Sequence, residues 1–281
     1  MKRLAILLGL LVSCNSPQVI VEDTIEEVSL TERYQIVKTI EDAVNATVQV
    51  DFGLATGTGF VVGHKIDPVT KSYYYEILSA AHVFEEDIPV DGSPVPPVRV
   101  VFSINKKKSF SLGTLEKIDI EADIALIKVY DFISDKPRCP IFEIEKGTEY
   151  LNYHTDVAIV GYPQGIGPIV TRGHISGIEM LEWDKESFLT TAQSAPGTSG
   201  GPVINLKTGR IIGMLRAVLV LRPSGQLLTW CSIVTPVSRI QRFLGEYYVE
   251  AYPYIIKPSE TSRGVSFQEK GNFLLFYPSE K

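Results

Sequence analysis

The sequence has 281 residues, of which 44% are hydrophobic and 21% are charged, and its formal net charge is -6 at pH 7. This composition is typical of a folded protein with one large domain or two small ones, and it excludes a chain that is disordered throughout. The negative charge argues against a nucleic-acid-binding surface, because phosphates are bound by clustered Lys and Arg side chains. The compact basic run at residues 106–108 is predicted to be the solvated tip of a hairpin.

The N-terminus has the features of an export signal. Lys2 and Arg3 precede an apolar run over residues 4–12, which is too short for a membrane-spanning helix of about 20 residues. The string L-V-S-C that ends at Cys14 resembles a bacterial lipobox, in which the cysteine is acylated and becomes the first residue of the mature protein. We therefore expect residues 1–14 to be a lipoprotein-type signal peptide and the lipidated Cys14 to anchor the protein to a membrane. The alternative is an ordinary secretory signal with a soluble product.

The residues after the lipobox bear on where the protein resides. Asn15 is not the Asp that retains many lipoproteins at the inner membrane, so we expect an exported outer-membrane lipoprotein that faces the periplasm. Residues 15–30 are polar and acidic and are predicted to form a flexible tether.

Cys139 and Cys231 are the cysteines that remain in the mature domain. Export would permit a disulfide between them, and two separate buried thiols are equally consistent with the sequence. No Cys/His spacing resembles a zinc site, so neither a metal nor an organic cofactor is expected. The histidines are scattered at His64, His82, His154 and His174.

A short amphipathic helix is predicted over residues 31–45, where apolar side chains recur at helical spacing. Beyond it, two series of short segments rich in β-branched and aromatic residues alternate with Gly, Pro and Asp turns, which is typical of strands. The first series starts at Ala46, Gly59, Tyr73, Val98 and Ile124, and the second at Val157, Ile169, Ser187, Pro202, Arg210 and Ser232.

The two series predict two β-barrels, over about residues 46–135 and 148–236, with the joint near residues 136–147. Apolar residues after the second series follow helical spacing, so a closing helix is expected and the folded domain should span residues 31–248. Residues 249–281 form a C-terminal extension in which a hairpin is predicted.

The strongest local signal is the string P-G-T-S-G-G-P at residues 196–202. A serine hydroxyl becomes a nucleophile when a base takes its proton and when donors bind the oxyanion that forms on the attacked carbonyl. Glycines around Ser199 permit positive φ and a close approach of substrate, so the N–H groups of Gly197 and Ser199 are predicted to form the oxyanion hole. An ordinary glycine-rich turn is the alternative, and a phosphate loop is disfavoured because no Lys-Ser/Thr pair follows the glycines.

Other motifs stand in a fixed order around this loop. A-A-H ends at His82 after an apolar strand, and D-I-A-L begins a further strand at Asp123. With these motifs the chain resembles the chymotrypsin-like serine proteases, and the HtrA/Deg group in particular, over about residues 36–244. This resemblance implies an all-β, trypsin-like fold of two six-stranded antiparallel β-barrels, with a short N-terminal helix and a C-terminal helix. The other matching strings are G-T-G-F at 57–60, V-A-I-V-G-Y-P at 157–163 and T-R-G-H-I-S at 171–176.

The resemblance implies that His82, Asp123 and Ser199 form a catalytic triad between the barrels. In this chemistry His82 takes the proton of Ser199 and later gives it to the leaving amine, while Asp123 orients and stabilises the imidazole. The chain order His, Asp, Ser is that of chymotrypsin-like enzymes. We therefore predict a serine endopeptidase that cleaves polypeptide substrates of the cell envelope or outside the cell through an acyl-enzyme.

The resemblance also implies the walls of a substrate pocket. No Asp lies at its expected base, so a small or medium apolar side chain is the expected preference. Arg216 could indicate an acidic preference, but it is more readily interpreted as a solvated residue at a strand edge. The implied substrate-binding residues are Thr191, Gln193, Leu215, Arg216, Ala217 and Ser232.

Two features depart from the resembled proteins. Thr198 replaces the Asp that pairs with a newly cut N-terminus in many digestive proteases, so activation by such a cleavage is not expected. HtrA proteins usually carry PDZ domains, whereas the segment after Leu244 is too short for one. We therefore expect a stand-alone protease domain that is a monomer or a homotrimer.

Two other functions are compatible with the same motifs. A catalytically silent protein of this fold could hold peptides in its cleft, although the intact triad argues against it. An esterase could use the same acyl-transfer chemistry.

Overall fold

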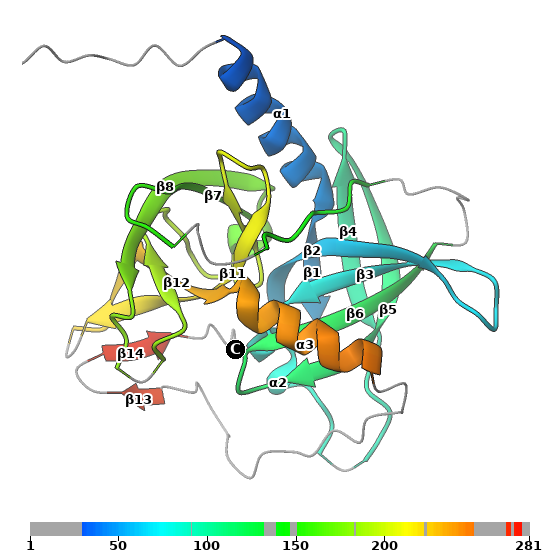
Figure 1. The fold of residues 1–281 in the computed structure, drawn as a ribbon. Coiled ribbons are helices and arrows are strands. Elements are labelled where there is room, and N and C mark those ends of the chain that lie inside the picture. Colours follow the sequence, from blue (N-terminus) through cyan, green and yellow to red (C-terminus); the bar gives the residue numbers. More distant parts are fainter. Residues whose placement is uncertain are drawn as a thin grey trace, which may run out of the picture.

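The computed structural model describes residues 30–90, 92–131, 139–146, 151–182, 184–221, 224–249, 268–270 and 273–276. Its strands form two closed, six-stranded antiparallel β-barrels that lie side by side (Figure 1), as predicted. The first barrel consists of β1 Thr47–Phe52, β2 Ala55–Ile66, β3 Tyr73–Ser79, β4 Val98–Ile104, β5 Lys107–Asp119 and β6 Ile124–Asp131. The second consists of β7 Asp156–Gly161, β8 Ile169–Ile178, β9 Phe188–Thr190, β10 Pro202–Asn205, β11 Ile211–Leu221 and β12 Gln226–Pro236.

In the first barrel, apolar residues that alternate along the strands face inward and form the hydrophobic core. Inward-facing residues of β1, among them Val48, Val50 and Phe52, are buried in one cluster with residues of β3, β4 and β6. The hairpin between β4 and β5 turns at Asn105 and Lys106, both of which have positive φ. The predicted basic hairpin tip is therefore confirmed, whereas β5 was missed because most of its first residues are polar and exposed.

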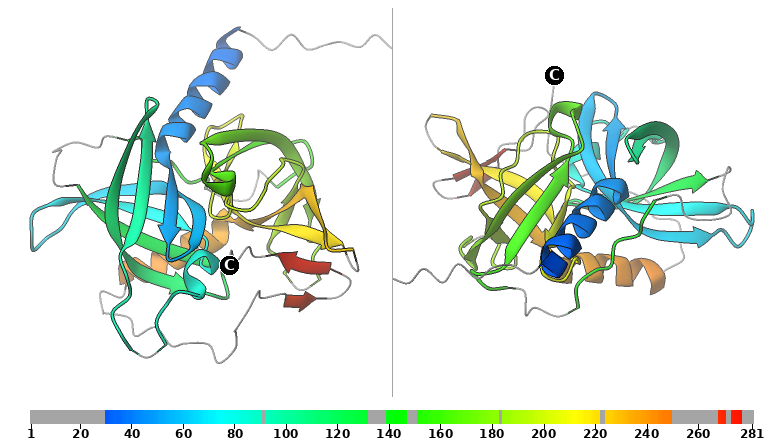
Figure 2. Two further views of the ribbon diagram at one scale, coloured as in Figure 1. Left: turned by 180° about the vertical axis from the view of Figure 1, so that it is seen from behind. Right: turned by 90° about the horizontal axis from the view of Figure 1, so that it is seen from above.

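A separate hydrophobic cluster joins the two barrels. It contains Phe60 and Leu126 of the first barrel and Val160 and Met214 of the second. Helix α1, Leu30–Ala46, contributes Ala43 and Ala46, and helix α3, Val237–Val249, contributes Ile240 and Phe243. Figure 2 shows α1 in the angle between the barrels and α3 across the first barrel. Both predicted helices are therefore present, and each secures one barrel against the other.

Helix α3 reaches the first barrel although it follows the second in sequence. The ammonium of Lys117, on β5, donates a 3.0 Å hydrogen bond to the Phe243 carbonyl and lies 4.4 Å from the centre of that ring. The expected C-terminal hairpin is also present, as β13 Gln268–Lys270 and β14 Phe273–Phe276, and β14 extends the sheet by pairing with β11.

Cys139 and Cys231 are not bridged to each other. Cys139 is buried in the core of the first barrel, whereas Cys231 lies on β12 of the second, so the possible disulfide is not formed. Among the described residues, no helix is long and apolar enough to cross a membrane. The predicted signal peptide, Cys14 and most of the tether lie outside the described residues.

Candidate active site

His82 and Asp123 form a buried pair in the first barrel. The ring Nδ1 of His82 lies 2.9 Å and 3.0 Å from the two carboxylate oxygens of Asp123, and the backbone N–H of His82 donates to Oδ1 at 3.0 Å. Only 6% of the His82 side chain and 4% of the Asp123 side chain are exposed. Because Nδ1 faces the carboxylate, Asp123 determines the orientation of the ring and directs Nε2 away from itself.

Local backbone structure brings this pair together. His82 begins the one-turn helix α2, His82–Glu85, directly after the buried residues Ala80 and Ala81 that follow β3. Asp123 ends the turn before β6 and has a φ of 57°, a conformation that Asp adopts more readily than most residues. The N–H of Ala122 donates to the Asp119 carboxylate at 2.8 Å and so stabilises this turn. Sparsely populated backbone conformations of this kind are often found at functional sites.

The loop at residues 196–202, here named the nucleophile loop after the predicted nucleophile Ser199, is shaped by its glycines. Gly197 and Gly200 have φ values of +90° and +85°. A Cβ at Gly197 would lie 2.6 Å from the Tyr162 carbonyl oxygen, and one at Gly200 would lie 2.1 Å from the Thr58 carbonyl oxygen. Both the conformation and the lack of space therefore require glycine at these positions.

The carbonyl groups of this loop are engaged in a way that orients its N–H groups. The Pro196 carbonyl accepts from the Gln164 N–H, and the Thr198 carbonyl accepts from the Gly201 N–H, both at 2.9 Å. In a planar trans peptide the C=O and the following N–H point in opposite directions, so the N–H groups of Gly197 and Ser199 point away from these partners. Neither N–H donates to another described residue. That they bind an oxyanion remains a prediction, which this orientation supports.

Backbone contacts bring Ser199 to the His82 segment. The Ser199 carbonyl accepts from the Thr58 N–H at 2.8 Å, and a Cβ at Gly200 would lie 2.7 Å from the Ala80 nitrogen. No hydrogen bond joins Ser199 Oγ to His82 Nε2 in the structure. Such bonds are often long in enzymes without substrate and shorten in the reacting complex.

Thr58 is a residue of this site that the sequence analysis assigned no role. Its Oγ1 donates to the Gly197 carbonyl at 2.7 Å and accepts from the Tyr162 N–H at 2.9 Å. One hydroxyl of the first barrel thereby connects two segments of the second. Its position inside the G-T-G-F string, with a glycine on each side, was the signal that could have identified it.

The predicted substrate-binding residues have different surroundings. Ser232 is buried, and its Oγ lies 2.7 Å from Ser194 Oγ and donates to the Ala192 carbonyl at 2.8 Å. Gln193 lines a cavity of about 230 Å³, together with Ser194, Ala195, Thr198 and residues of the opposite wall. Thr191 accepts from the His174 N–H through its Oγ1. Leu215 and Ala217 are buried in two hydrophobic clusters of the second barrel and do not line this cavity.

Arg216 is not solvated, contrary to the favoured interpretation of the sequence. Only 7% of its side chain is exposed, its Nη1 lies 2.8 Å from Asp184 Oδ2, and its Nε lies 3.6 Å from Asp123 Oδ2. The pairing of β11 with β12 shifts between Leu215 and Ala217, so Arg216 is the extra residue of a β-bulge. A bulge redirects a side chain relative to simple alternation, which explains the error.

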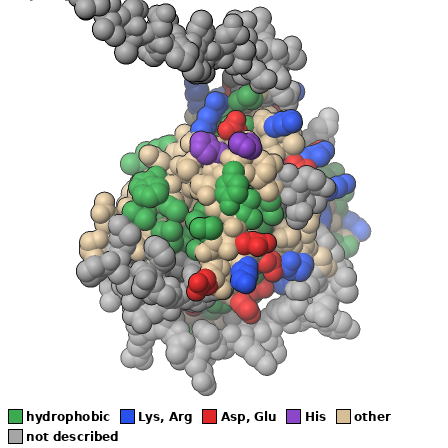
Figure 3. All heavy atoms as spheres, turned by 60° about the vertical axis from the view of Figure 1, so that its left-hand side comes forward, with side chains coloured by type: hydrophobic (Ala, Val, Ile, Leu, Met, Phe, Trp, Pro, Cys, Tyr) green, Lys and Arg blue, Asp and Glu red, His purple; other side chains and the backbone are tan. Residues whose placement is uncertain are grey.

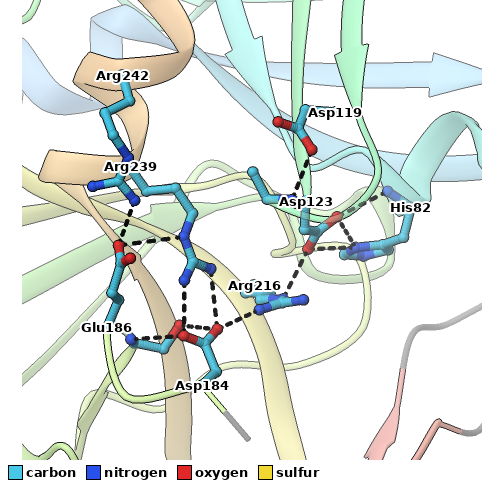
Figure 4. Close-up of polar contacts among 10 residues, drawn as sticks. His82, Asp119, Asp123, Asp184, Glu186, Arg216, Arg239 and Arg242 are labelled. Carbon is cyan, nitrogen blue, oxygen red and sulfur yellow. Dashed lines mark hydrogen bonds and ion pairs between the residues drawn. The ribbon is translucent and has the colours of Figure 1, made fainter.

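Asp184 is the centre of a buried ionic network (Figure 4). Arg239 of α3 donates to both of its carboxylate oxygens, at 2.8 Å and 3.0 Å, and Ser187 donates from its backbone and its hydroxyl. Burial alone would raise the pKa of Asp184, but the hydrogen bonds from Arg239 and Ser187 outweigh it and lower the pKa to about 2. On α2, burial raises the pKa of Glu85, and the negative charge of Asp123 adds to this effect.

Comparison with known families agrees with this geometry. Residues 57–214, more than half of the chain, match the family model of the trypsin-like peptidase domain. The chain therefore belongs to the trypsin-like peptidase domain family.

Individual relatives are similar over parts of their length. A human protein named peroxisomal leader peptide-processing protease is 23% identical over 209 residues, which is 72% of this chain and 32% of its own length. A Synechocystis protein named "Putative serine protease HhoB" is 31% identical over 170 residues, 58% of this chain and 34% of its own length. The chain thus matches about a third of the length of these relatives. The crystal structure of a serine endoprotease from Yersinia pestis aligns with a TM-score of 0.55 and 19% identity, over 75% of this chain and 65% of that one, which is a likeness of fold.

Proposed function

We propose that this protein is a serine endopeptidase that cleaves peptide bonds in envelope or extracellular proteins through an acyl-enzyme. Ser199 is the nucleophile, His82 is the general base and Asp123 orients the imidazole. The observation that carries this proposal is the buried contact between His82 and Asp123 beside a glycine-shaped loop, in which the N–H groups of Gly197 and Ser199 donate to no other described residue.

The reaction uses these groups in sequence. His82 takes the Ser199 proton as Oγ attacks the substrate carbonyl, and the N–H groups of Gly197 and Ser199 bind the oxyanion. The protonated imidazole then gives its proton to the leaving amine, which leaves Ser199 acylated. In the second half His82 takes a proton from water, which attacks the acyl group, and then returns that proton to Ser199 Oγ as the bond to the acyl group breaks and the new carboxylic acid leaves.

The substrate is an extended polypeptide with an uncharged side chain at the cleavage position. None of the described residues that line the cavity beside Gln193 and Ser194 is charged. Ile169, an exposed hydrophobic residue of the second barrel, lines this cavity, and Ile166 on the same segment is also exposed. The face turned forward in Figure 3 carries hydrophobic groups among charged ones. Such a surface suits unfolded proteins, which expose apolar side chains.

Export and lipidation at Cys14 would hold the enzyme at the outer membrane, facing the periplasm, as a monomer or a homotrimer. The features of residues 1–14 and the tether support this location. Equal labelling of the wild type and Cys14→Ser by a fatty-acid analogue would contradict the anchor, and sedimentation of the purified protein distinguishes the two assemblies.

A fluorophosphonate probe tests the proposed enzyme directly. We expect the wild type to be labelled at neutral pH and Ser199→Ala to remain unlabelled. Digestion of β-casein compared with hydrolysis of short esters separates an endopeptidase from an esterase. A folded wild type that the probe does not label would instead favour the peptide-binding protein.

A further inference from the structure

Arg216 lies next to Asp123 of the candidate triad. Figure 4 shows Asp123 between two partners, with the His82 ring on one side and the Arg216 guanidinium on the other. Arg216 reaches this position because it is the bulge residue of β11, directly after Leu215. The N–H and carbonyl of Leu215 bond to Gly201 and Gly200 of the nucleophile loop, so the same strand contacts both halves of the site.

The guanidinium is held in place and is not open to a substrate. Its Nη1 hydrogen bond to Asp184 and its small exposed fraction place it inside the protein. Asp184 is itself held by two hydrogen bonds from Arg239 on α3. This arrangement rules out Arg216 as the residue that binds an acidic substrate side chain, and it leaves Asp123 as the functional group that its charge affects most directly.

Besides Arg216, both negatively and positively charged groups lie in the region of His82 and Asp123. Negative groups come from α2 and the residue after it, from the end of β5, from the turn before β6 and from the loop before β9. A second cation comes from α3. These groups are Glu85, Glu86, Asp119, Asp123, Asp184 and Arg239. Arg216 is the cation closest to the Asp123 carboxylate among the described ion pairs, at 3.6 Å. Removal of its charge therefore leaves the His82 and Asp123 pair in a more negative environment.

We propose that Arg216 is a positioning residue that holds the Asp123 carboxylate and, through its charge, shapes the pH dependence of the reaction at Ser199. This inference rests on the proposed serine endopeptidase function. By neutralising part of the charge of Asp123, the guanidinium weakens the attraction that stabilises the protonated imidazole.

The test measures the second-order rate of labelling by a fluorophosphonate from pH 5 to 9 on the full chain. Arg216→Met removes the charge and keeps most of the volume, and we expect the midpoint of the acid limb to rise by about one pH unit. Asp184→Asn releases the Arg216 charge from its other partner, and we expect the midpoint to fall. Arg242→Met is the matched control, because Arg242 lies at the exposed end of the network and pairs with Glu186.

The midpoint of the acid limb is expected to shift in opposite directions in Arg216→Met and Asp184→Asn. A purely structural role of Arg216 would not produce opposite shifts. A folded Arg216→Met protein with the wild-type midpoint, even at a reduced maximal rate, would overturn the proposal. If Arg216→Met does not fold, the direction of the shift in Asp184→Asn decides the question in the same way. Failure of the enzyme assignment is recognisable separately, since the wild type itself would then not be labelled at any pH.

Discussion

The two halves of the candidate site are built by different kinds of contact. The first barrel supplies His82 and Asp123, which are held by hydrogen bonds that end on side chains. The second barrel supplies Ser199 on a loop held by backbone hydrogen bonds and by glycines that leave no room for a Cβ. The first half therefore depends on functional groups and the second on backbone geometry. Substitutions should therefore damage the two halves in different ways.

The largest effect is expected from the side-chain half. His82→Ala removes the base, and we expect kcat for peptide hydrolysis to fall by about 10⁴-fold or more. Because no backbone contact of the nucleophile loop changes, KM should remain close to that of the wild type. A variant that keeps a tenth of the wild-type kcat with substrate in excess would contradict the role of His82.

Gly197→Ala tests the backbone half. The new Cβ meets the Tyr162 carbonyl at a φ of +90°, so the loop must move and its N–H groups lose their orientation. We expect kcat to fall by about 10²- to 10³-fold, which is the effect of losing an oxyanion donor. Gly225→Ala is the control, since Gly225 also has a positive φ, of +69°, but nothing lies within 4 Å of its Cβ. Equal losses of kcat in both variants would show that general backbone strain is responsible.

Asp184 makes the stability of the second barrel depend on pH. Its pKa of about 2 in the folded protein is below the ordinary value of about 4, so its contribution to the free energy of unfolding is present above pH 4 and is lost as the pH falls toward 2. We expect this contribution to be about 2 kcal/mol. Urea unfolding at several pH values should show that the gap between wild type and Asp184→Asn narrows over this window, and a constant gap would contradict the role of the charge.

The smallest effect on kcat is expected where the two halves meet. Thr58→Val removes the hydroxyl that joins the first barrel to Gly197 and Tyr162. We expect kcat to fall about tenfold and the free energy of unfolding to fall by about 1 to 3 kcal/mol, because two buried polar groups lose a partner. Thr56→Val, on the same strand, removes a hydroxyl that bonds to Asp51 instead and should leave kcat unchanged. A Thr58→Val enzyme with full kcat would contradict this connecting role.

Much of the architecture could be predicted from local patterns. Short β-branched segments between turns indicated two barrels, and helical spacing indicated the helices before and after them, because alternation and periodicity report directly on burial. Strand β5 was missed because its exposed polar residues hide the alternation. The motifs also predicted that His82 lies against Asp123, and the structure places their side chains in contact. Their catalytic roles, and that of Ser199, remain predictions that the experiments above test.

What the sequence by itself determined is therefore most of the strands, the loop that needs glycine and the residues able to carry the chemistry. Only the tertiary structure decided what surrounds them. Arg216 was expected in solvent, but a bulge that depends on the pairing of β11 with β12 turns it inward to Asp123 and Asp184. Arg239 and Thr58 find their partners across helices and barrels that are distant in sequence. Local sequence patterns indicate which side chains are buried. The charged and hydrogen-bonding neighbours of a side chain are set by long-range packing, so these neighbours could be identified only in the folded molecule.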